Sequence, residues 1–385
     1  MNVFLTGTTG LLGGELLINL SKRNDIDKIY CLIRSANEAE ANIKLEKVFN
    51  LHHDFLDRDK VSVIVGDLAD ENLTNVLLQN PDLKNINLII HSAACTFFSR
   101  IYDDLVEKIN IDGLNKVVQW AKQLKDLSTF LYIGTAAICG KDQKNRIIFE
   151  TESPDIHARH LVKYTFTKMQ GELLLHRELP KDKLLIVRPS IIMGDSRPVN
   201  PRSPVILWAL ATFNMLRLCP INPDAQLDII SVDFTADSIV KLLFVKRQHN
   251  VYHISAGPGS TTTPLKLGKA LEPSFLDLPP LKFVSKSLVN QIKLWSKGID
   301  KNNGLAEYAD YCSYWEKIFE DKGNLRIIFS GLDPYIEFIE LGQIYDNSRM
   351  LNDLNIDAPA PAHIYIHESI GYLKSINILE GASDS

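Results

Sequence analysis

The sequence lacks the features of an exported, disulfide-bonded or zinc-binding protein. Its five cysteines are odd in number, lie far apart in the 385-residue chain and include no Cys-x-x-Cys pair, so neither a disulfide framework nor a metal site is predicted. The first residues form a strand-like run rather than a basic segment followed by an apolar one. We therefore expect no signal peptide and a cytoplasmic location.

The sequence also lacks an excess of positive charge and an apolar run as long as a membrane span. The net charge of −5 argues against nucleic acid as a partner, because proteins that bind it need a basic surface to displace counterions from phosphates. The most apolar stretch, 203–220, is interrupted by Thr212, Asn214 and Arg217 and falls short of the ~20 residues that a bilayer requires. It is either a buried helix or a segment that lines an apolar substrate channel or touches a membrane surface.

Short β-rich apolar runs alternate with helix-length segments over about the first two thirds of the chain. This alternation is typical of a doubly wound α/β fold, in which helices cover both faces of a parallel sheet. The predicted strands are Val3–Leu5, Ile29–Ile33, Val61–Val65, Leu88–His91, Phe130–Ile133, Leu184–Arg188 and Val251–Ile254. The predicted helices are Leu11–Ser21, Glu38–Phe49, Asp103–Gln123 and Lys163–Glu178. We therefore expect a Rossmann-type parallel sheet.

The last third of the chain consists of proline-punctuated segments of mixed length, which indicate a smaller, mostly helical region. We predict a dinucleotide-binding domain at 1–190, completed by about 222–257, and a substrate-binding region made of 191–221 and 258–385. The sequence shows no internal repeat, and only the tail 380–385 is expected to be disordered. Both a monomer and a homodimer are compatible with these features.

A glycine-rich loop directly follows the first predicted strand and opens the first predicted helix. In the sequence TGTTGLLGG, which starts at Thr6, three glycines have the spacing Gly-x-x-Gly-x-x-Gly. The first permits a tight turn, the second lets the backbone approach a pyrophosphate, and the third allows close packing of helix and strand. The alternative is a tight connection that binds nothing. The residues predicted to hold a dinucleotide are Gly7, Thr9, Gly10, Leu11 and Gly13.

The end of the second predicted strand favours NADP over NAD. An acidic residue there would bind the ribose 2′-hydroxyl of NAD, whereas a basic residue accepts the 2′-phosphate of NADP. The strand ends in Arg34 and Ser35, so we predict that NADPH is the cofactor. Lys44 on the following helix adds a second positive charge or, alternatively, lies on a solvated face.

Further polar or small residues follow successive strands, at the carboxyl edge where ligands of such sheets bind. Asp67 and Leu68 are placed to meet the adenine amino group and ring, although Asp67 alternatively caps a helix. Ser92, Ala93 and Ala94 are small enough to lie beside the dinucleotide. We predict that all five residues contact the cofactor.

A tyrosine, a lysine and a threonine are the candidate catalytic residues. Tyr164 and Lys168 lie four residues apart on a predicted helix, so their side chains project from the same face. A lysine beside a phenol favours the phenolate and lowers its pKa, which suits a proton donor near neutral pH. Thr135 supplies a hydroxyl partner, or else only ends its strand with a backbone hydrogen bond. The alternative for the pair is a half-buried tyrosine beside a solvated lysine.

These motifs resemble the extended short-chain dehydrogenase/reductases over about the first two thirds of the chain. The loop Thr6–Gly13, Thr135 and the pair Tyr164 and Lys168 match that family's cofactor loop and Ser/Thr-Tyr-Lys triad in order and approximate spacing. The resemblance implies hydride transfer with a nicotinamide cofactor. It also implies that Asn110, on the helix before the threonine strand, helps to position the lysine through water.

Longer matches are similar to the branch of that family that contains fatty acyl-CoA reductases and thioester reductase domains. They are CLIRS at 31–35, RPSIIMGDSR at 188–197, LDIISVDFTADSIV at 227–240 and YDNSRMLNDLNI at 345–356. The sequence departs from this branch at Gly134 and Thr135, where the reductases commonly have Ser-Thr. It also shows no adenylation or carrier domain, so we expect a thioester to arrive on CoA or on a separate carrier protein.

The resemblance implies an NADPH-dependent reduction of an acyl thioester. Thr135 and Tyr164 would hydrogen-bond the developing oxyanion, Tyr164 would donate its proton, and Lys168 would bind the nicotinamide ribose. Pro189 and Ser190 would line the nicotinamide pocket. Collapse of the hemithioacetal gives a thiol and an aldehyde, and a second hydride would give the alcohol.

The substrate and the activity have alternatives. Aromatic residues in 203–220, including Trp208 and Phe213, and in 308–319 either enclose an acyl chain or belong to the core. The same triad would serve an NADP-linked dehydrogenase of a hydroxysteroid, terpenoid or flavonoid-like ketone, whereas Arg34 disfavours the NAD-dependent sugar-nucleotide epimerases. A non-catalytic NADP-sensing regulator is disfavoured because both the tyrosine and the lysine are present.

Overall fold

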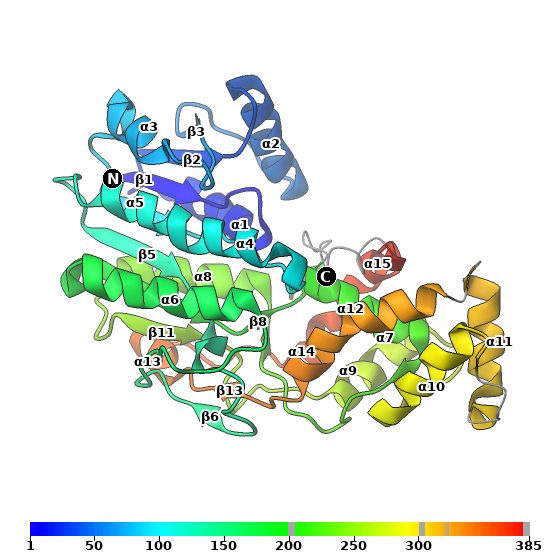
Figure 1. Cartoon of the computed structure of the whole chain (residues 1–385). Coiled ribbons are helices and arrows are strands. Elements are labelled where there is room, and N and C mark those ends of the chain that lie inside the picture. The colour runs from blue at the N-terminus through cyan, green and yellow to red at the C-terminus, as the bar shows by residue number, and fades with distance from the viewer. Residues whose placement is uncertain (199–204, 300–304, 320, 322, 380–385) are drawn as a thin grey trace.

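The computed structural model describes residues 1–198, 205–299, 305–319, 321 and 323–379. Its centre is a parallel seven-stranded sheet in the order β11-β7-β5-β4-β1-β2-β3 (Figure 1). The strands are β1 Asn2–Thr6, β2 Lys28–Ile33, β3 Val61–Val65, β4 Leu88–His91, β5 Thr129–Ile133, β7 Leu184–Pro189 and β11 Val251–Ile254. All seven predicted strands are in this sheet, which confirms the doubly wound Rossmann-type fold. The tail 380–385 lies outside the described residues.

The strands are apolar because helices cover both faces of the sheet. Every residue of β4 and of β7 is buried, and Val3, Phe4 and Leu5 in β1 are fully buried. The strand order reverses between β1 and β4, so the loops after these two strands diverge and leave a crevice at the carboxyl edge of the sheet. The glycine-rich loop is the one that follows β1.

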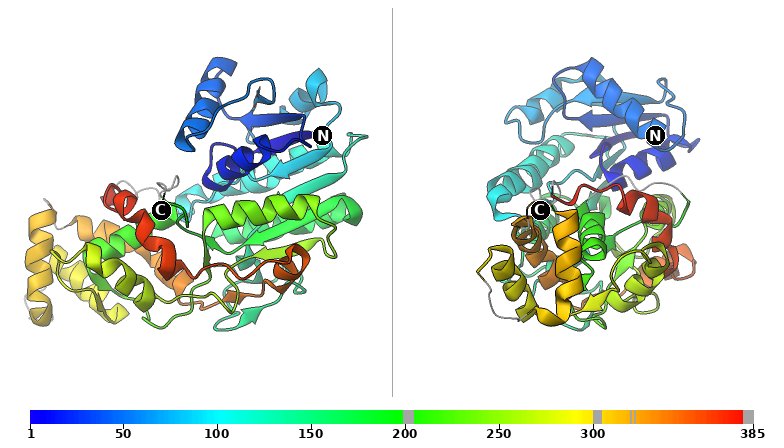
Figure 2. Two further views of the ribbon diagram at one scale, coloured as in Figure 1. Left: turned by 180° about the vertical axis from the view of Figure 1, so that it is seen from behind. Right: turned by 90° about the vertical axis from the view of Figure 1, so that its right-hand side faces the viewer.

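Two layers of helices enclose the sheet. They comprise α1 Leu11–Ser21, α2 Glu38–Leu51, α3 Leu73–Gln79, α5 Leu114–Ala121, α6 Lys163–Glu178 and α8 Val232–Phe244. The helices α1, α2 and α8 pack on one face, and α3, α5 and α6 pack on the other. Figures 1 and 2 show these two layers from opposite sides. The bounds of α1 and α6 are those predicted, and α2 ends at Leu51 rather than Phe49.

The helix predicted at 103–123 is present as one continuous helical run, 103–121, but it contains a π-helical turn that was not predicted. The structure has α4 Asp103–Glu107, then a π-helical turn at Lys108–Gly113, and then α5. Such turns insert an extra residue into a helix and are frequent at functional sites. This one contains Asn110, which bonds to the loop after β4 and to α6. These tertiary bonds stabilise a geometry that helical periodicity does not predict.

A lobe of helices extends from the carboxyl edge of the sheet (Figure 1). It consists of α7 Val205–Leu216, α9 Pro264–Leu271, α10 Lys286–Ser296, α11 Ala309–Ile318, α12 Asn324–Ile339, α14 Ala362–Tyr365 and α15 Ile370–Leu373. Three pairs of two-residue strands accompany it: β6 Ile147–Ile148 with β13 Ile344–Tyr345, β8 Ile191–Ile192 with β10 Ile229–Ile230, and β9 Leu218–Cys219 with β12 Lys282–Phe283. Within the described ranges, no helix combines the length and the apolar character needed to cross a bilayer.

One late helix, α13 Ser348–Leu354, leaves the lobe and packs against the sheet. Met350 is fully buried in the apolar cluster that also contains residues of α1 and α8. The hydroxyl of Tyr252 in β11 donates to Oδ2 of Asp353 at 2.6 Å. The chain after residue 258 therefore contributes to both parts of the molecule, and the division into cofactor and substrate regions stays a prediction.

A buried ion pair joins α6 to β7. Nε of Arg188 donates to Oε2 of Glu172 at 3.0 Å, and its Nη2 donates to Oε1. Nη1 of Arg188 also donates to the carbonyl oxygen of Glu152 at 3.2 Å. Burial is the largest influence on the pKa of Glu172 and raises it, but the charge of Arg188 and the hydrogen bonds from His176 and Arg188 together outweigh burial and leave that pKa below its usual value. The pair anchors the helix that carries Tyr164 and Lys168.

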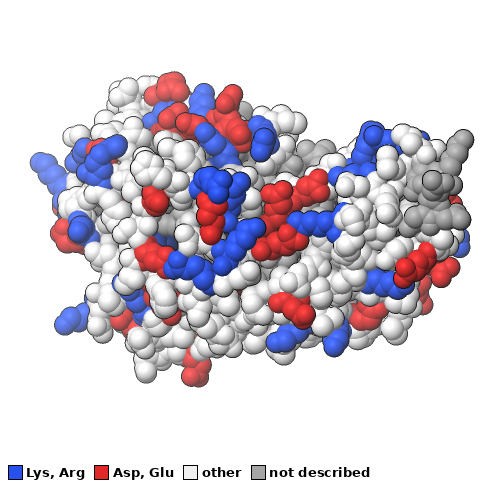
Figure 3. Space-filling view, turned by 60° about the horizontal axis from the view of Figure 1, so that its bottom comes forward, with Lys and Arg blue, Asp and Glu red and all other residues white. Residues whose placement is uncertain are grey.

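Charged residues of both signs are interspersed on the surface. Figure 3 shows a face on which Lys and Arg side chains lie among Asp and Glu side chains. Exposed ion pairs such as Lys286 with Glu340, at 2.5 Å, and Lys293 with Asp333, at 3.2 Å, contribute little to stability because both partners remain solvated. The stability of the fold therefore depends on its buried clusters and the buried pair.

Candidate active site

The glycine-rich loop has the geometry that a dinucleotide pyrophosphate requires. Gly7 has a φ of +79°, and a Cβ on it would lie 2.6 Å from the backbone nitrogen of Ala93. A Cβ on Gly13 would lie 2.0 Å from the carbonyl oxygen of Gly7. Gly10 is the N-cap of α1, and within the described chain no side chain caps this helix. The first amides of α1 can therefore donate to an anion, and the loop fits a nicotinamide dinucleotide.

Arg34 lies immediately after β2, with an exposed side chain. Nζ of Lys44 on α2 donates to the carbonyl oxygen of Arg34 at 2.8 Å and pairs with Glu40 at 2.5 Å. Oγ of Ser35 donates to the carbonyl oxygen of Asn37 at 2.9 Å. The structure thus places Lys44 beside Arg34, with Glu40 offsetting part of its charge. The role of these residues toward a 2′-phosphate stays a prediction.

Asp67 and Leu68 follow β3. Oδ1 of Asp67 accepts a hydrogen bond from the amide of Ala69 at 2.9 Å, so the carboxylate caps a turn at the strand end. Leu68 is buried, and a Cβ on Gly113 would lie 2.7 Å from its Cβ. These contacts show how the two residues are held, and their contact with adenine stays a prediction.

Ser92, Ala93 and Ala94 follow β4 and face the glycine-rich loop across the crevice. Ser92 and Ala94 line the cavity that Gly7 also borders. The amide of Ala93 donates to Oγ1 of Thr6 at 3.1 Å. Because the two loops approach so closely, a side chain at position 7 would overlap the backbone of Ala93.

One cavity of ≈440 Å³ joins the glycine-rich loop to the candidate catalytic residues. The predicted residues that line it are Gly7, Gly10, Leu11, Gly13, Ser92, Ala94, Thr135, Tyr164, Lys168, Pro189 and Ser190. The predicted residues that lie outside its wall are Thr9, Arg34, Ser35, Lys44, Asp67, Leu68, Ala93 and Asn110. The structure therefore brings the predicted Thr-Tyr-Lys group to the same space as the predicted cofactor loop.

Burial governs the protonation of Tyr164 and Lys168. Nζ of Lys168, whose residue is 3% exposed, donates to the carbonyl oxygen of Ile133 at the end of β5 at 2.7 Å. Burial lowers the pKa of Lys168 to about 7 and raises the pKa of Tyr164 to about 12. The sequence predicted a lowered pKa for the phenol. The structure differs because the half-buried Tyr164 is desolvated by its surroundings and the lysine nitrogen bonds to a backbone carbonyl.

The lowered pKa of Lys168 predicts that the free energy of unfolding rises with pH above neutrality. The folded chain releases the lysine proton near pH 7, whereas an unfolded lysine titrates near pH 10.4. Between these values the unfolded chain binds the additional proton, so stability increases with pH by up to about 1.4 kcal/mol per unit. Urea unfolding at about pH 7 and about pH 9 should show this increase in the wild type relative to Lys168→Met. An identical pH dependence of both proteins would contradict it.

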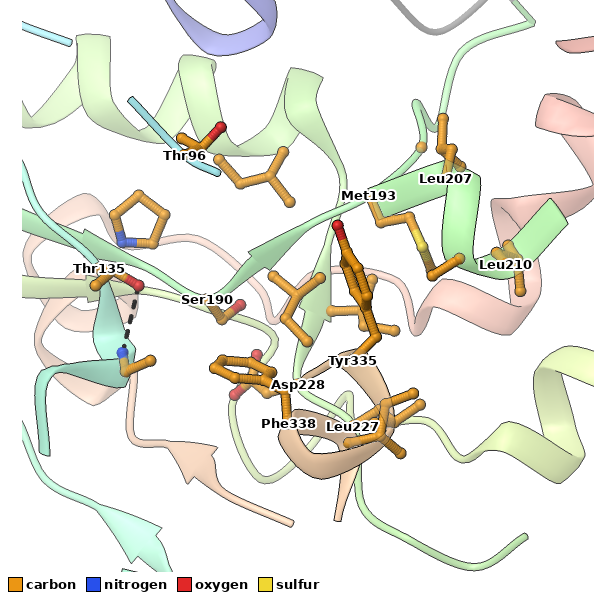
Figure 4. Close-up of a pocket in the computed structure, with 18 of the residues that line it drawn as sticks. Thr96, Thr135, Ser190, Met193, Leu207, Leu210, Leu227, Asp228, Tyr335 and Phe338 are labelled. Carbon is orange, nitrogen blue, oxygen red and sulfur yellow. Dashed lines mark hydrogen bonds between the residues drawn. The ribbon is translucent and has the colours of Figure 1, made fainter. Parts of the chain in front are cut away.

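Thr135 follows β5 and faces the cavity (Figure 4). Its Oγ1 accepts a hydrogen bond from the amide of Ala137 at 3.4 Å and caps the short helical turn Ala136–Cys139. Because the oxygen acts as the acceptor in this bond, the hydroxyl hydrogen is left for a second acceptor. Thr135 therefore makes the backbone hydrogen bond that was considered as its alternative role, and its hydroxyl can still donate to a ligand in the cavity.

Asn110 connects two elements of the site rather than lining its wall. Its Oδ1 accepts from the amide of Cys95 at 2.8 Å, and its Nδ2 donates to the carbonyl oxygen of Cys95 at 3.0 Å and to Oγ1 of Thr167 at 3.0 Å. These bonds tie the loop after β4 to α6, next to Lys168. A link from Asn110 to the lysine through water stays a prediction.

The cavity continues from Thr135 into the helical lobe as an apolar arm. Leu207 and Leu210 on α7 and Tyr335 on α12 line this arm. Figure 4 shows Leu207 and Leu210 on the far side of the cavity from Thr135, with Tyr335 between Thr135 and these leucines in this view. Phe213, in the predicted channel segment 203–220, also lines the arm, and residues 203–204 of that segment lie outside the described ranges.

The other aromatic residues considered for an acyl channel belong to the core of the lobe. Nε1 of Trp208 donates to the carbonyl oxygen of Ile378 at 2.9 Å, and the ring is buried away from the cavity. Tyr311 and Trp315, in the segment 308–319, are buried in the same cluster. Of the two roles considered for these aromatic residues, the core role is therefore correct for Trp208, Tyr311 and Trp315.

Phe98 is a site residue that the sequence analysis missed. Its ring centre lies 6.4 Å from that of Tyr164 and 5.1 Å from that of Tyr335, so it borders the passage between the triad and the arm. Its place in the loop after β4 is a signal that would have found it, because such loops line the ligand crevice. Tyr335 and Phe338, on a helix of the lobe, have no comparable local signal.

Pro189 and Ser190 lie at the end of β7, where the cavity passes from the sheet to the lobe. Asp228 lies beside them in the wall, and its carboxylate accepts from the amides of Ala256 at 2.8 Å and Tyr345 at 3.0 Å. Burial raises the pKa of Asp228, and these hydrogen bonds oppose the rise. Asp228 therefore fixes three chain segments around the cavity, a role that the sequence analysis did not assign.

Comparison with known proteins identifies relatives of this chain. A family model described as male sterility protein matches residues 5–239 of the 385-residue chain. The putative fatty acyl-CoA reductase CG8303 of Drosophila melanogaster is 27% identical over 339 residues, which cover 76% of this chain and 62% of that protein. Human fatty acyl-CoA reductase 1 is 24% identical over 308 residues, which cover 68% of this chain and 58% of that protein. The chain thus spans less than two thirds of the length of these relatives.

A solved structure has the same fold. The terminal R domain from the myxalamid PKS-NRPS biosynthetic pathway matches with a TM-score of 0.71 and 19% identity, covering 97% of this chain and 90% of that domain. The likeness is one of architecture, because the identity is low. The family match confirms the resemblance inferred from the sequence motifs. The chain belongs to the male sterility protein family, a nicotinamide-dinucleotide-binding branch of the extended short-chain dehydrogenase/reductases that includes the fatty acyl-CoA reductases.

Proposed function

We propose that this protein is an NADPH-dependent reductase of an acyl thioester. The observation that carries the proposal is the single cavity that runs from the glycine-rich loop, past Thr135, Tyr164 and Lys168, into an apolar arm. The fatty acyl-CoA reductases among its relatives support a thioester substrate, carried on CoA or on a carrier protein. The segments 191–221 and 258–385 supply the walls of the arm in this proposal.

The triad acts on the carbonyl oxygen of the thioester. NADPH bound at the glycine-rich loop supplies the hydride for the carbonyl carbon. Tyr164 transfers its phenolic proton to the oxygen, and Thr135 donates a hydrogen bond to the same atom, where negative charge develops. Lys168 lies on the same face of α6 as Tyr164 and holds the nicotinamide ribose.

The aldehyde forms when the hemithioacetal collapses. Its hydroxyl proton returns to Tyr164, the carbon–oxygen double bond forms again, and the carbon–sulfur bond breaks. The departing sulfur takes up a proton from solvent and leaves as a thiol, so that each thioester consumes one hydride and one proton in all. The aldehyde is the first product, and a second hydride transfer would convert it to the alcohol.

The test is a panel of substrates offered to the purified protein with NADPH. Acyl-CoAs of several lengths, aldehydes and ketones are compared by NADPH absorbance and by colorimetric detection of thiol. We expect NADPH oxidation with acyl-CoAs, accompanied by one thiol for each thioester reduced. Oxidation with ketones alone would reject the proposal in favour of a ketone dehydrogenase. If none of these compounds causes NADPH oxidation although the protein binds NADPH tightly, a sensing protein would be favoured.

Arg34→Asp is expected to weaken NADPH binding by about 10- to 100-fold, because it removes a charge-assisted bond to the 2′-phosphate. NADH binding should change far less, since NADH has no such phosphate. Titration of cofactor fluorescence measures both affinities. Arg177→Asp is the matched control, because Arg177 is exposed near the end of α6, at the opposite edge of the sheet. Equal losses for the two cofactors would contradict the role of Arg34.

A further inference from the structure

The face of a buried tyrosine ring lies against the lysine of the candidate triad. Nζ of Lys168 lies over the ring of Tyr132, 4.9 Å from its centre. Tyr132 is 1% exposed and Lys168 is 3% exposed. Tyr132 is in β5, one residue before Ile133, whose carbonyl oxygen accepts a hydrogen bond from Nζ at 2.7 Å. The end of one strand therefore meets the lysine nitrogen with both a carbonyl oxygen and a ring.

A buried ammonium needs neighbours that offset its loss of water, because an unpaired charge is costly in the interior. The next acidic residue along α6, Glu172, pairs with Arg188, so it does not neutralise Lys168. The face of an aromatic ring is negative and attracts a cation that lies within about 6 Å of its centre. Tyr132 is therefore placed to stabilise the ammonium form of Lys168 without supplying a charge.

The ring of Tyr132 is itself held by its surroundings. Its hydroxyl donates to the carbonyl oxygen of Lys168 at 3.4 Å. Its ring is stacked with that of His91, its register partner in β4, with the centres 6.2 Å apart and 16° between the planes. A Cβ on Gly171 would lie 2.5 Å from the tyrosine hydroxyl oxygen, so glycine allows α6 to pass this close to the ring. The ring thus has a fixed position relative to the lysine.

The other titratable groups near Lys168 bring no free negative charge to it. Those of α6 around Lys168, and of the elements bonded to α6 there, are His91, Glu107, Tyr132, His160, Tyr164, Glu172, His176 and Arg188. Burial, together with the charge of Lys168, lowers the pKa of His91 to about 3, and burial lowers the pKa of His160 to about 4. Both imidazoles are therefore neutral at pH 7. Glu107 pairs with Lys163 at the start of α6.

We propose that Tyr132 positions the ammonium of Lys168 through the face of its ring, and so holds Nζ where it can bind the nicotinamide ribose. The inference rests on the proposed reductase function, in which Lys168 has that task. Tyr132 lies outside the cavity wall that Lys168 lines, so it acts through the lysine and is a positioning residue. Its shape alone does not suffice, because a ring without a negative face would pack in the same space but attract the ammonium less.

The test replaces Tyr132 by phenylalanine or by a trifluorinated phenylalanine, which has a similar shape but a less negative face. Each replacement is made in the full chain, once with Lys168 and once with Lys168→Met. Urea unfolding of the four proteins forms a double-mutant cycle, in which the contributions of all other titratable groups cancel. The cycle is measured at about pH 5.5, where Lys168 is charged, and at about pH 9, where the lowered pKa of about 7 makes it neutral.

Fluorination is expected to raise the unfolding equilibrium constant about 2- to 30-fold more with Lys168 than with Lys168→Met at the lower pH. The difference should vanish at the higher pH, because a neutral amine is not attracted to the ring face as a cation is. A purely structural role of the ring would give the same difference at both pH values. That result, or no difference at the lower pH, would overturn the inference.

The activity of the same two ring variants gives a second measurement. In the proposed mechanism the rate of NADPH oxidation falls as Lys168 loses its proton. This fall should begin at a pH about 0.4 to 1.5 lower in the trifluorinated variant than in Tyr132→Phe, because the weaker ring face favours the neutral amine. A lower rate at every pH, with the fall at the same pH in both variants, would reject the role of Tyr132.

The unfolding cycle requires neither cofactor nor substrate, so it separates this inference from the proposed function. If no thioester is reduced but the cycle shows the difference at the lower pH, the proposed function fails while the attraction between Tyr132 and Lys168 stands. If thioesters are reduced and the cycle shows no such difference, the inference alone is overturned.

Discussion

Tyr164→Phe is expected to lower the rate of NADPH oxidation by roughly 10²- to 10⁴-fold, the range in which positioned acid catalysts act. The substitution removes only the phenolic oxygen, while the ring keeps its stacked contact with Phe98 at 6.4 Å. The loss should therefore fall on kcat, because Tyr164 acts on the oxygen at which charge develops in the transition state. Steady-state kinetics with the best substrate of the panel measure it.

The control for this prediction is Tyr311→Phe. Tyr311 is buried in the core of the lobe, away from the cavity, and its hydroxyl donates to the carbonyl oxygen of Pro280 at 2.5 Å. This variant loses the same atom and a hydrogen bond, but it should retain activity at a temperature at which it is folded. A Tyr164→Phe enzyme with the wild-type rate would show that another group protonates the substrate.

Glu172→Leu is expected to lower the free energy of unfolding by about 3–5 kcal/mol, because it leaves the buried guanidinium of Arg188 without its counter-ion. The double variant Glu172→Leu with Arg188→Met should recover most of this loss, since it removes both charges from the interior. Urea unfolding followed by circular dichroism measures each value. A double variant no more stable than the single one would contradict this account.

The control for the buried pair is the exposed pair of Asp237 and Lys241 on α8, at 2.7 Å. Lys241→Met should change the free energy of unfolding by less than about 1 kcal/mol, because both charges are solvated. The pKa of Glu172 is below its usual value, so the buried pair stabilises the fold above the unfolded pKa of about 4.3. That contribution should be lost as the pH falls through the lower, folded pKa.

The sheet and the cofactor loop could be predicted from the sequence because their signals are local. A strand that is covered on both faces appears in the sequence as a short apolar run. The glycine spacing reflects close backbone contacts, of Gly13 with Gly7 within the loop and of Gly7 with Ala93 in the loop after β4. The π-helical turn could not be predicted in this way. It depends on bonds from Asn110 to Cys95 and Thr167, which come together only when the loop after β4, the turn and α6 are assembled.

The candidate site was predictable where it lies at strand ends and not where it lies in the lobe. Thr135 and Ser190 follow strands, and the cavity contains both. Aromatic residues of α11 and α12 look alike in the sequence, yet Trp315 is buried in the core and Tyr335 borders the cavity. Which ring faces the cavity depends on how several helices pack together, and the sequence of one helix alone does not predict that packing.

The return of α13 to the sheet has a consequence for the order in which the chain can fold during synthesis. The last strand of the sheet ends at Ile254, but the apolar surface beside α1 and α8 on which Met350 packs remains uncovered until α13 is made. A nascent chain emerging from the ribosome therefore exposes this apolar surface while about a hundred further residues are made. During that interval the growing chain is expected to need shielding by chaperones, and arrested chains that stop short of α13 should aggregate more readily than those that include it.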